Sequence, residues 1–556
     1  MKARFGLVLV AAVCCSICLP AYSQTGKQEA RPALEWDAAP SPESGAPDPL
    51  APPHFDTPAP LAPGVLTVAP QASEPAEADP LVIAVRQHLA ARSVPRGAGD
   101  REDQAALIAF YAERTRSVWI ERDGLSEQAK LAMAEISKAD DWGLKATAFE
   151  LPPIAPSTDV DGLSGAEIAL SLAVLKYARH ARGGRLDPPS VSRKFDQRPR
   201  VYEPKSVMLG IAGSGSADAY LRGLHPKHDQ FVRLQRALMV ARSAAAGEDS
   251  AQNVQRIVAN MERWRWMPGD LGAFYVWDSI PEQIARVIDN GKVVFAEKIV
   301  VGRPTTPTPI FSADMLFIIF HPSWGVPAGI KTQELWPQLR DSGGGWFSTK
   351  PLASSVLSAH GLQVTRGGVP VDPDAIDWAR VDIRTYDFVQ PPGPSNVLGV
   401  VKFRFPNKHD VYMHDTPERH LFGNGLRAFS HGCMRVQNPV QLAEVLLAHD
   451  KGLSVAQVQG YVKRGGEIRL MTPIPVHVTY FTVTVDEHDN ARYFTDVYGL
   501  DSRVASALEG QPITLRTSGT TEDPVVRTGP AARSKSRVRR ADKPPSNSPF
   551  AAIFGN

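Results

Sequence analysis

Apolar side chains recur every three to four positions from residue 81 to residue 267, which is the spacing of amphipathic helices. The pattern is clearest in the segments 81–92 (LVIAVRQHLAAR), 103–114 (DQAALIAFYAER) and 126–139 (SEQAKLAMAEISKA). A longer segment of the same kind ends at Gly183, and glycine commonly follows the last turn of a helix. We therefore expect a helical domain over residues 81–267.

Beyond residue 268 the apolar positions alternate, and the chain predicts β-structure. Residues 284–302 (IARVIDNGKVVFAEKIVVG) contain two β-rich runs around Asn290-Gly291, which is a strong hairpin signal. A second hairpin is expected within residues 480–499. A mainly-β domain, either a barrel or a sandwich interrupted by helices, is thus expected over residues 268–505.

One segment of this β-rich half breaks the alternation. Residues 331–395, approximately, are rich in proline and include Gly343-Gly344-Gly345. Long irregular segments beside a catalytic core often close over a substrate, so we expect an insertion that caps the site. The predicted fold class is α+β, with a helical domain followed by a mainly-β domain that carries a capping insertion.

The two ends of the chain predict no packed core. Residues 1–23 have the layout of a secretory signal peptide, with two cationic residues, an apolar run too short for a comfortable membrane span, and a small-residue cleavage site. Residues 24–80 are rich in Pro and Ala and predict a disordered tether. Residues 506–556 predict a disordered basic tail. We therefore expect export across the inner membrane.

Composition narrows the classes of function. The net charge of +2 gives no indication of nucleic-acid binding, and no apolar run after the signal is long enough for a membrane span. Three of the four cysteines lie within the signal, so Cys433 is the one that remains in the mature chain. Exported proteins normally pair their cysteines, so Cys433 is a buried small side chain, half of an intermolecular disulfide, or a reactive thiol.

The neighbours of Cys433 favour the reactive thiol. Within residues 411–439 (VYMHDTPERHLFGNGLRAFSHGCMRVQNP) we expect a strand that ends at His414 and a helix that begins after Asn438. Cys433 would then lie on the loop between the strand and the helix, near the N-terminal end of the helix. Backbone N–H groups at that end and the nearby Arg435 would favour a thiolate.

A thiolate nucleophile needs a base within hydrogen-bonding reach. His414 is the preferred base, because His431 is so close to Cys433 in sequence that the two side chains tend to point apart. His431 would instead help to shape the loop. A rival interpretation makes His414, His431 and Cys433 ligands of a zinc ion, although structural zinc usually draws on four ligands and no second cysteine remains.

The motif resembles the active-site signature of the L,D-transpeptidases of bacterial cell walls. That signature is a histidine, a spacer of this length, then Ser/Thr-His-Gly-Cys with a nearby Arg or Asn. Here fifteen residues separate His414 from Ser430-His431-Gly432-Cys433, and Arg435 follows. The flanking segments 260–268 (NMERWRWMP) and 321–327 (HPSWGVP) are similar to the large murein L,D-transpeptidases of Gram-negative envelopes. Those relatives have a helical scaffold domain before a YkuD-type catalytic domain with a capping insertion.

The resemblance implies a periplasmic, cell-wall-associated peptidoglycan L,D-transpeptidase that forms 3→3 cross-links between tetrapeptide stems through a thioester on Cys433. His414 would take the thiol proton, and backbone N–H groups of residues 431–433 would stabilise the oxyanion. Ser430 would shape the loop, and Arg435 would hold it or bind a substrate carboxylate. The resemblance also implies acylation by carbapenem β-lactams and no need for a metal or organic cofactor.

One departure from the relatives bears on wall attachment. They usually carry a small peptidoglycan-binding domain just before the NMERWRW motif, but here only about twenty residues separate residues 234–238 (LQRAL) from it. We therefore expect this module to be absent. Three alternatives remain open: an L,D-carboxypeptidase that uses water as the acceptor, a cysteine peptidase acting on wall peptides, and a non-catalytic wall-associated scaffold.

Overall fold

The computed structural model describes most of the two expected domains and little of the chain ends. The expected signal peptide, residues 24–77 of the expected tether, and residues 514–556 of the expected tail lie outside the described residues. The described residues are 78–121, 124–154, 159–243, 248–342 and 350–513. Within these ranges, no helix is both long enough and apolar enough to cross a membrane.

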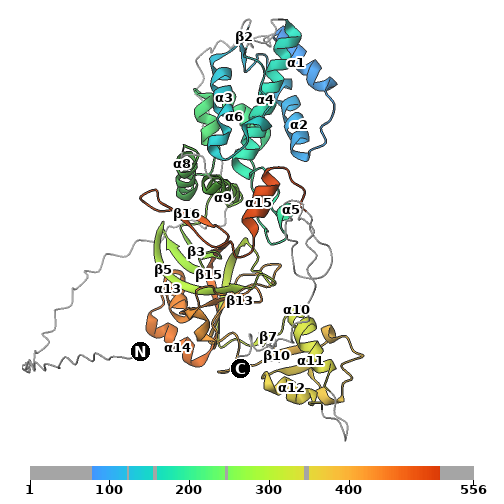
Figure 1. Ribbon diagram of the computed structural model, residues 1–556, viewed down its shortest axis with the longest axis vertical. Coiled ribbons are helices and arrows are strands. Elements are labelled where there is room, and N and C mark those ends of the chain that lie inside the picture. The colour runs from blue at the N-terminus through green and yellow to red at the C-terminus, as the bar shows by residue number, and fades with distance from the viewer. Residues whose placement is uncertain (1–77, 122–123, 155–158, 244–247, 343–349, 514–556) are drawn as a thin grey trace, which may run out of the picture. The chain divides into compact units, whose positions relative to one another are not determined.

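The helical domain is built around one long helix, α4 (Val160–Gly183). Its first turn is capped by the Asp159 carboxylate, which accepts a hydrogen bond from the Gly162 N–H, and its interior positions are almost all buried. The other helices of this part are α1 (Pro80–Ala91), α2 (Ala98–Ala112), α3 (Glu127–Ser137), α5 (Pro188–Val191), α6 (Pro204–Ala212), α7 (Ala217–Gly223), α8 (Asp229–Ser243) and α9 (Glu248–Arg265) (Figure 1). The expected helical domain is confirmed.

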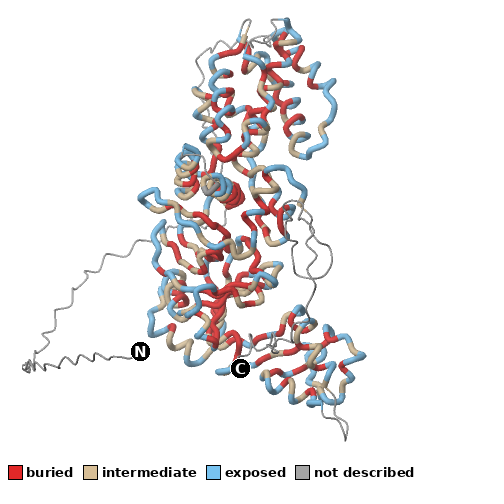
Figure 2. The backbone as a smooth tube through the Cα atoms, in the orientation of Figure 1, coloured by how far each residue is buried: buried red, intermediate tan, exposed pale blue. Residues whose placement is uncertain are grey.

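The minor elements of the helical domain are a two-stranded hairpin and two short 3₁₀ helices. They are β1 (Ile120–Glu121), β2 (Gly124–Leu125), η1 (Ala139–Trp142) and η2 (Ala146–Ala148). Figure 2 shows that the buried residues of the helical bundle line its interior, and apolar side chains from α1, α2, α3, α4, α6 and α7 form that core.

The mainly-β domain is organised around a nine-stranded sheet, with the order β13-β5-β14-β12-β11-β6-β15-β3-β4. Because β4 also pairs with β5, the sheet closes on itself as in a barrel. The strands are β3 (Phe274–Ser279), β4 (Ile284–Asp289), β5 (Lys292–Gly302), β6 (Phe311–Phe320), β11 (Val401–Arg404), β12 (Met413–His414), β13 (Ala428–Ser430), β14 (Met434–Val436) and β15 (Gly466–Thr479).

Two features of the sheet had been expected from the sequence. The β4–β5 hairpin turns at Asn290-Gly291, and both residues have positive φ, as a type I′ turn requires. The later hairpin pairs β16 (Val483–Val485) with β17 (Ala491–Tyr493). Both hairpin predictions are confirmed.

The capping insertion is a small folded unit between β6 and β11. It has its own sheet, with the order β7-β10-β8-β9, and its own apolar core, which includes Trp324, Leu335, Trp378 and Phe388. Its elements are β7 (Trp324–Gly325), α10 (Ala328–Ile330), the π-helix η3 (Lys331–Leu335), α11 (Trp336–Arg340), α12 (Ala353–Ala359), β8 (Gln363–Arg366), β9 (Val369–Pro370), η4 (Pro373–Ala375), η5 (Ile383–Thr385) and β10 (Asp387–Gln390) (Figure 1).

The rest of the chain is mostly helical. It comprises η6 (Arg419–Gly423), α13 (Pro439–Lys451), α14 (Val455–Arg464) and α15 (Leu500–Leu508). One detail of the expected loop was wrong. Cys433 does not lead directly into α13, because β14 intervenes between the cysteine and the helix and pairs with β5 and β12. The three residues of β14 carry the chain away from Cys433 before the helix begins.

A strap formed by residues 192–198, which follow α5, passes beside the sheet. Phe195 is buried against Trp266 and forms a bridge with Ile310. The Asp196 carboxylate accepts a hydrogen bond from Lys408 and also pairs with His409. The strap therefore attaches the chain at two points next to the segment that leads into β12.

Candidate active site

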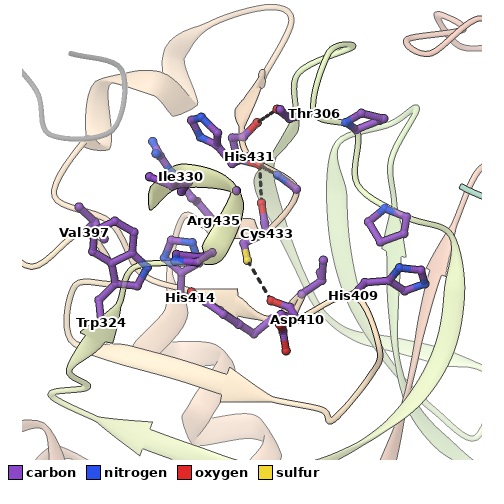
Figure 3. Close-up of a pocket in the computed structure, with 18 of the residues that line it drawn as sticks. Thr306, Trp324, Ile330, Val397, His409, Asp410, His414, His431, Cys433 and Arg435 are labelled. Carbon is purple, nitrogen blue, oxygen red and sulfur yellow. Dashed lines mark hydrogen bonds between the residues drawn. The ribbon is translucent and has the colours of Figure 1, made fainter. Parts of the chain in front are cut away.

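The parallel pairing of β12 with β14 brings the two candidate catalytic residues together. Met413 pairs with Met434, and His414 pairs with Arg435. Met413 and Met434 both belong to the core of the sheet. Because side chains alternate between the two faces of a strand, His414 and Cys433, the neighbours of these methionines, point to the opposite side. Both line one cavity (Figure 3).

This cavity has a volume of about 300 Å³. The Ser-His-Gly-Cys loop and the segment 409–412 form its catalytic wall, and the strap and the capping insertion complete it. The strap contributes Arg193 and Lys194, and the insertion contributes Trp324, Ile330 and Glu334. The candidate site is therefore enclosed by parts of the chain that are more than a hundred residues apart in sequence.

The Cys433 sulfur is half-buried and hydrogen-bonded in a way that favours the neutral thiol. The thiol donates to the Asp410 carbonyl, with 3.8 Å between Sγ and the oxygen (Figure 3). Burial raises the pKa of Cys433 to about 11, although Tyr412, Lys402 and Arg435 act in the opposite direction. The expectation of a thiolate at this position was wrong for the substrate-free protein, because desolvation outweighs the nearby cations.

Tyr412 links the insertion to the nucleophile. Its hydroxyl hydrogen-bonds the Cys433 sulfur, and the Trp324 side chain from β7 hydrogen-bonds the same hydroxyl. The Lys402 ammonium lies over the Tyr412 ring, 3.9 Å from its centroid. Tyr412 and Lys402 thus give the sulfur a donor and a positive charge, both of which favour its ionised form once a substrate displaces the present contacts.

His414 is buried and held as a neutral imidazole. Burial, together with the positive charge of Arg435, lowers the pKa of His414 to about 3. Its Nδ1–H donates to the Asp415 carbonyl, which leaves Nε2 with the lone pair. A fixed, uncharged imidazole of this tautomer can accept a proton through Nε2, as the predicted role as base requires.

Ser430 and Gly432 shape the loop. The Gly432 N–H donates to Ser430 Oγ at 3.1 Å, and Ser430 Oγ donates in turn to the Cys433 carbonyl at 2.5 Å. Gly432 has a φ of +116°, which a residue with a Cβ rarely adopts. Because the Gly432 N–H is already bonded, the N–H groups of His431 and Cys433 are the better candidates for an oxyanion site.

Two threonines support this loop from the β5–β6 connection. Thr306 Oγ1 donates to the Ser430 carbonyl at 3.0 Å, and Thr308 Oγ1 donates to the Gly432 carbonyl at 2.8 Å. With these carbonyls bonded on one side, the loop is fixed in a single conformation. Nothing in the sequence around the cysteine motif pointed to these threonines, which lie more than a hundred residues earlier.

The two remaining predicted residues have acidic partners. The His431 imidazole is hydrogen-bonded to the Glu334 carboxylate of the insertion, and Arg435 forms a buried ion pair with Glu418. Both acidic partners were missed by the sequence reasoning, and so was Tyr412. The alternation in VYMH places Tyr412 and His414 on the same face of an extended segment, so that signal was available for Tyr412.

The zinc interpretation finds no support in the geometry. Among the described residues, no group of three or more His, Cys, Asp or Glu side chains is arranged to hold a metal ion. His420, which lies between the two motif histidines in sequence, is exposed on η6 and does not line the cavity.

Comparisons with known proteins identify both domains. The family model of the L,D-transpeptidase catalytic domain (YkuD) matches residues 273–473, and that of the Scaffold domain matches residues 105–238. A curated Haemophilus influenzae protein named "Putative L,D-transpeptidase" is 26% identical over 254 residues, which cover 45% of this chain and 49% of the relative. The chain therefore spans about half the length of the curated relative that it matches.

Among solved structures, similar chains include LD transpeptidase LdtMt1 in complex with imipenem, at 15% identity and a TM-score of 0.17, covering 37% of this chain and 59% of that one. An L,D-transpeptidase from Mycobacterium smegmatis is 14% identical at a TM-score of 0.16, covering 37% and 58%. The identification rests on the two family models and the curated relative. The chain thus carries a Scaffold domain followed by a catalytic domain that belongs to the YkuD family of L,D-transpeptidases.

Proposed function

We propose that this protein is a periplasmic peptidoglycan L,D-transpeptidase that forms 3→3 cross-links through a thioester on Cys433. The observation that carries the proposal is the placement of His414 and Cys433 on adjacent parallel strands, with both side chains directed into one cavity. The donor is a tetrapeptide stem, and the acceptor is the side-chain amine of a second stem. The catalytic domain family and the export signal both support this assignment.

In the first half-reaction His414 Nε2 takes the Cys433 proton, and the sulfur attacks the carbonyl of the third stem residue. The oxyanion accepts hydrogen bonds from backbone N–H groups of the loop, and donors of this kind typically contribute about 3 kcal/mol each. His414 then returns the proton to the departing D-alanine amine. The thioester forms as the peptide bond breaks, so the protons balance within this half-reaction.

The neutral thiol–imidazole pair has a consequence for this step. Burial favours the uncharged forms of both groups, so the substrate-free enzyme is not ionised in advance. Ionisation must therefore accompany substrate binding, when the contact between the thiol and the Asp410 carbonyl is exchanged for contacts with the donor stem. Tyr412 and Lys402 then stabilise the developing thiolate.

Muropeptide analysis tests the proposal. Purified protein is incubated with tetrapeptide-rich sacculi, and the digested products are identified by mass spectrometry. The wild-type protein is expected to produce 3→3-linked dimers, and Cys433→Ala is expected to produce none. Products shortened by one residue, without dimers, would instead indicate an L,D-carboxypeptidase. An unchanged muropeptide profile in the presence of an intact Cys433 would reject both activities.

Acylation by a carbapenem tests the assignment of the base. His414→Gln is expected to slow the mass increase on Cys433 about a hundredfold or more at neutral pH. His431→Gln is expected to acylate within about threefold of the wild-type rate, because it is not the proposed base for the thiol. If His431→Gln were the slow variant and His414→Gln acylated normally, the roles would be reversed.

A further inference from the structure

The capping insertion brings one carboxylate to the Ser-His-Gly-Cys motif. Glu334 lies on the π-helix η3, and π-helical turns are frequently found at functional sites. Glu334 Oε1 is hydrogen-bonded to His431 Nε2, and the two side chains are 9% and 16% exposed. The Arg303 guanidinium lies next to both, with its NH2 3.9 Å from Glu334 Oε1. The contact joins two segments 97 residues apart in sequence.

This contact determines the tautomer of His431. A carboxylate oxygen and an unprotonated ring nitrogen repel each other, so Nε2 carries the proton and donates it to Glu334. Arg303 then serves as a second cation beside the carboxylate. The proton-free nitrogen of His431 is therefore Nδ1, and His431 lines the catalytic cavity. A carboxylate that orients an imidazole in this way also stabilises the imidazolium that forms when the free nitrogen takes a proton.

Two imidazoles of opposite tautomer consequently flank Cys433. His414 is protonated on Nδ1 by its bond to the Asp415 carbonyl, whereas His431 is protonated on Nε2 by its bond to Glu334. The two residues lie on different sides of Cys433 (Figure 3). His414 is the more enclosed of the two, packed at the Tyr412 ring, while His431 faces the wall that the insertion supplies.

The proposed function requires two proton transfers of different kinds, and the inference rests on that function. Thiol activation needs a base at the sulfur. The acceptor amine needs a base at a second position, because an alkyl amine is almost entirely protonated at neutral pH and an ammonium cannot attack a thioester. We propose that the Glu334–His431 pair, present only while the insertion is docked, is the general base for the acceptor amine.

The step balances as follows. His431 Nδ1 takes one proton from the acceptor ammonium and becomes an imidazolium paired with Glu334, later releasing the proton to solvent. The free amine attacks the thioester carbonyl, the carbon–nitrogen bond forms, and the carbon–sulfur bond breaks. The second amine proton passes to the departing Cys433 sulfur, which returns to the thiol. No oxidant, metal or further co-reactant is consumed.

The experiment separates the two half-reactions. Acylation of Cys433 by a carbapenem is followed by mass spectrometry, and transfer to an alkyl amine is followed as dimer formation from tetrapeptide stems. For Glu334→Gln we expect acylation within about twofold of the wild-type rate and transfer reduced about tenfold or more, with recovery toward high pH as the amine loses its proton unaided. Asp341→Asn, an exposed carboxylate of the same insertion, serves as the control and should change neither rate.

A second acceptor distinguishes a base from a purely structural contact. Hydroxylamine is already unprotonated at neutral pH, so Glu334→Gln should transfer the acyl group to it at close to the wild-type rate. Equal losses with hydroxylamine and with alkyl amines would overturn the proposal, because they would show that Glu334 only positions the insertion. Unchanged transfer to alkyl amines would overturn it too. If the wild-type protein acylated but never transferred to an amine, the proposed transpeptidase function would fail instead.

Discussion

Arg435 and Glu418 form an ion pair that is buried behind the catalytic loop. The side chains are only 5% and 8% exposed, and Arg435 NH1 donates to a Glu418 oxygen. Arg435 also pairs in register with His414 through β12 and β14. Of the two roles expected for Arg435, this geometry favours holding the loop, because its charge is already neutralised by a side chain of the protein.

Removing one member of this pair should strongly destabilise the fold. Glu418→Gln leaves the Arg435 charge buried without its partner, so we expect the free energy of unfolding to fall by about 3–5 kcal/mol. Urea denaturation measures it. The exposed pair between Glu127 and Lys130 is the control, where Glu127→Gln should cost under about 1 kcal/mol. Near-wild-type stability with a raised KM for Arg435→Ala would instead assign Arg435 to substrate binding.

The reactivity of the free thiol should depend steeply on pH. Because burial raises the pKa of Cys433 to about 11, the thiolate fraction grows about tenfold per pH unit between pH 7 and pH 10. The rate of alkylation by iodoacetamide in the substrate-free protein is expected to follow that slope. Tyr412→Phe removes a hydrogen bond to the sulfur and should make alkylation slower at every pH in this range. A rate that is constant above pH 7 would show that the thiolate already predominates.

Asp278 on β3 should make stability depend on pH. It is fully buried, and neither carboxylate oxygen has a hydrogen-bond partner among the described residues. Burial raises the pKa of Asp278 to about 8. The stability that this group contributes is therefore complete below about pH 4, where the unfolded chain is also protonated, and is lost as the pH rises through about 8, at about 1.4 kcal/mol per unit.

Asp278→Asn should remove this dependence. The free energy of unfolding of the variant, relative to the wild type, is expected to rise by about 3 kcal/mol between pH 5 and pH 7. Urea titrations at the two pH values measure the difference, with the exposed Asp341→Asn as control. The same difference at both pH values would mean that Asp278 is ionised in the folded protein and has a partner there.

The strap places positive charge at the rim of the cavity. Arg193 is exposed and lines the cavity, and the strap is held by Phe195 and Asp196. Stem peptides carry carboxylates, so Arg193→Glu is expected to raise KM about tenfold, with a smaller change in kcat and a weaker effect at high salt. Arg198→Glu, a charge change on the strap outside the cavity lining, is the matched control. Equal effects of the two substitutions would point to overall charge rather than to a subsite.

Local patterns were sufficient to predict much of the architecture. The hairpin at Asn290-Gly291 follows from turn chemistry that two residues determine, and the strand ending at His414 follows from alternation over a few positions. The positions of His414 and Cys433 in one cavity were reached through the spacing of a motif. All of these signals are short in range.

The state of the site required the three-dimensional structure. The Glu334–His431 contact depends on how the insertion folds back onto the loop, which no spacing indicates. The elevated thiol pKa arises from burial by several distant segments, so the sequence-based expectation of a thiolate gave too much weight to the nearby Arg435 and the helix end. The strand β14 was missed because three residues are too few for a periodic pattern.

The capping insertion leaves and re-enters the barrel at neighbouring points, where the His321 N–H donates to the Val400 carbonyl at 2.8 Å. With an apolar core of its own, it can change in sequence while the barrel strands keep their packing. Recognition of the incoming chain and formation of the acyl bond are thus carried by segments that can diverge separately. An engineer who wishes to redirect the enzyme to a new amine can graft or randomise this one module and leave the nucleophile untouched.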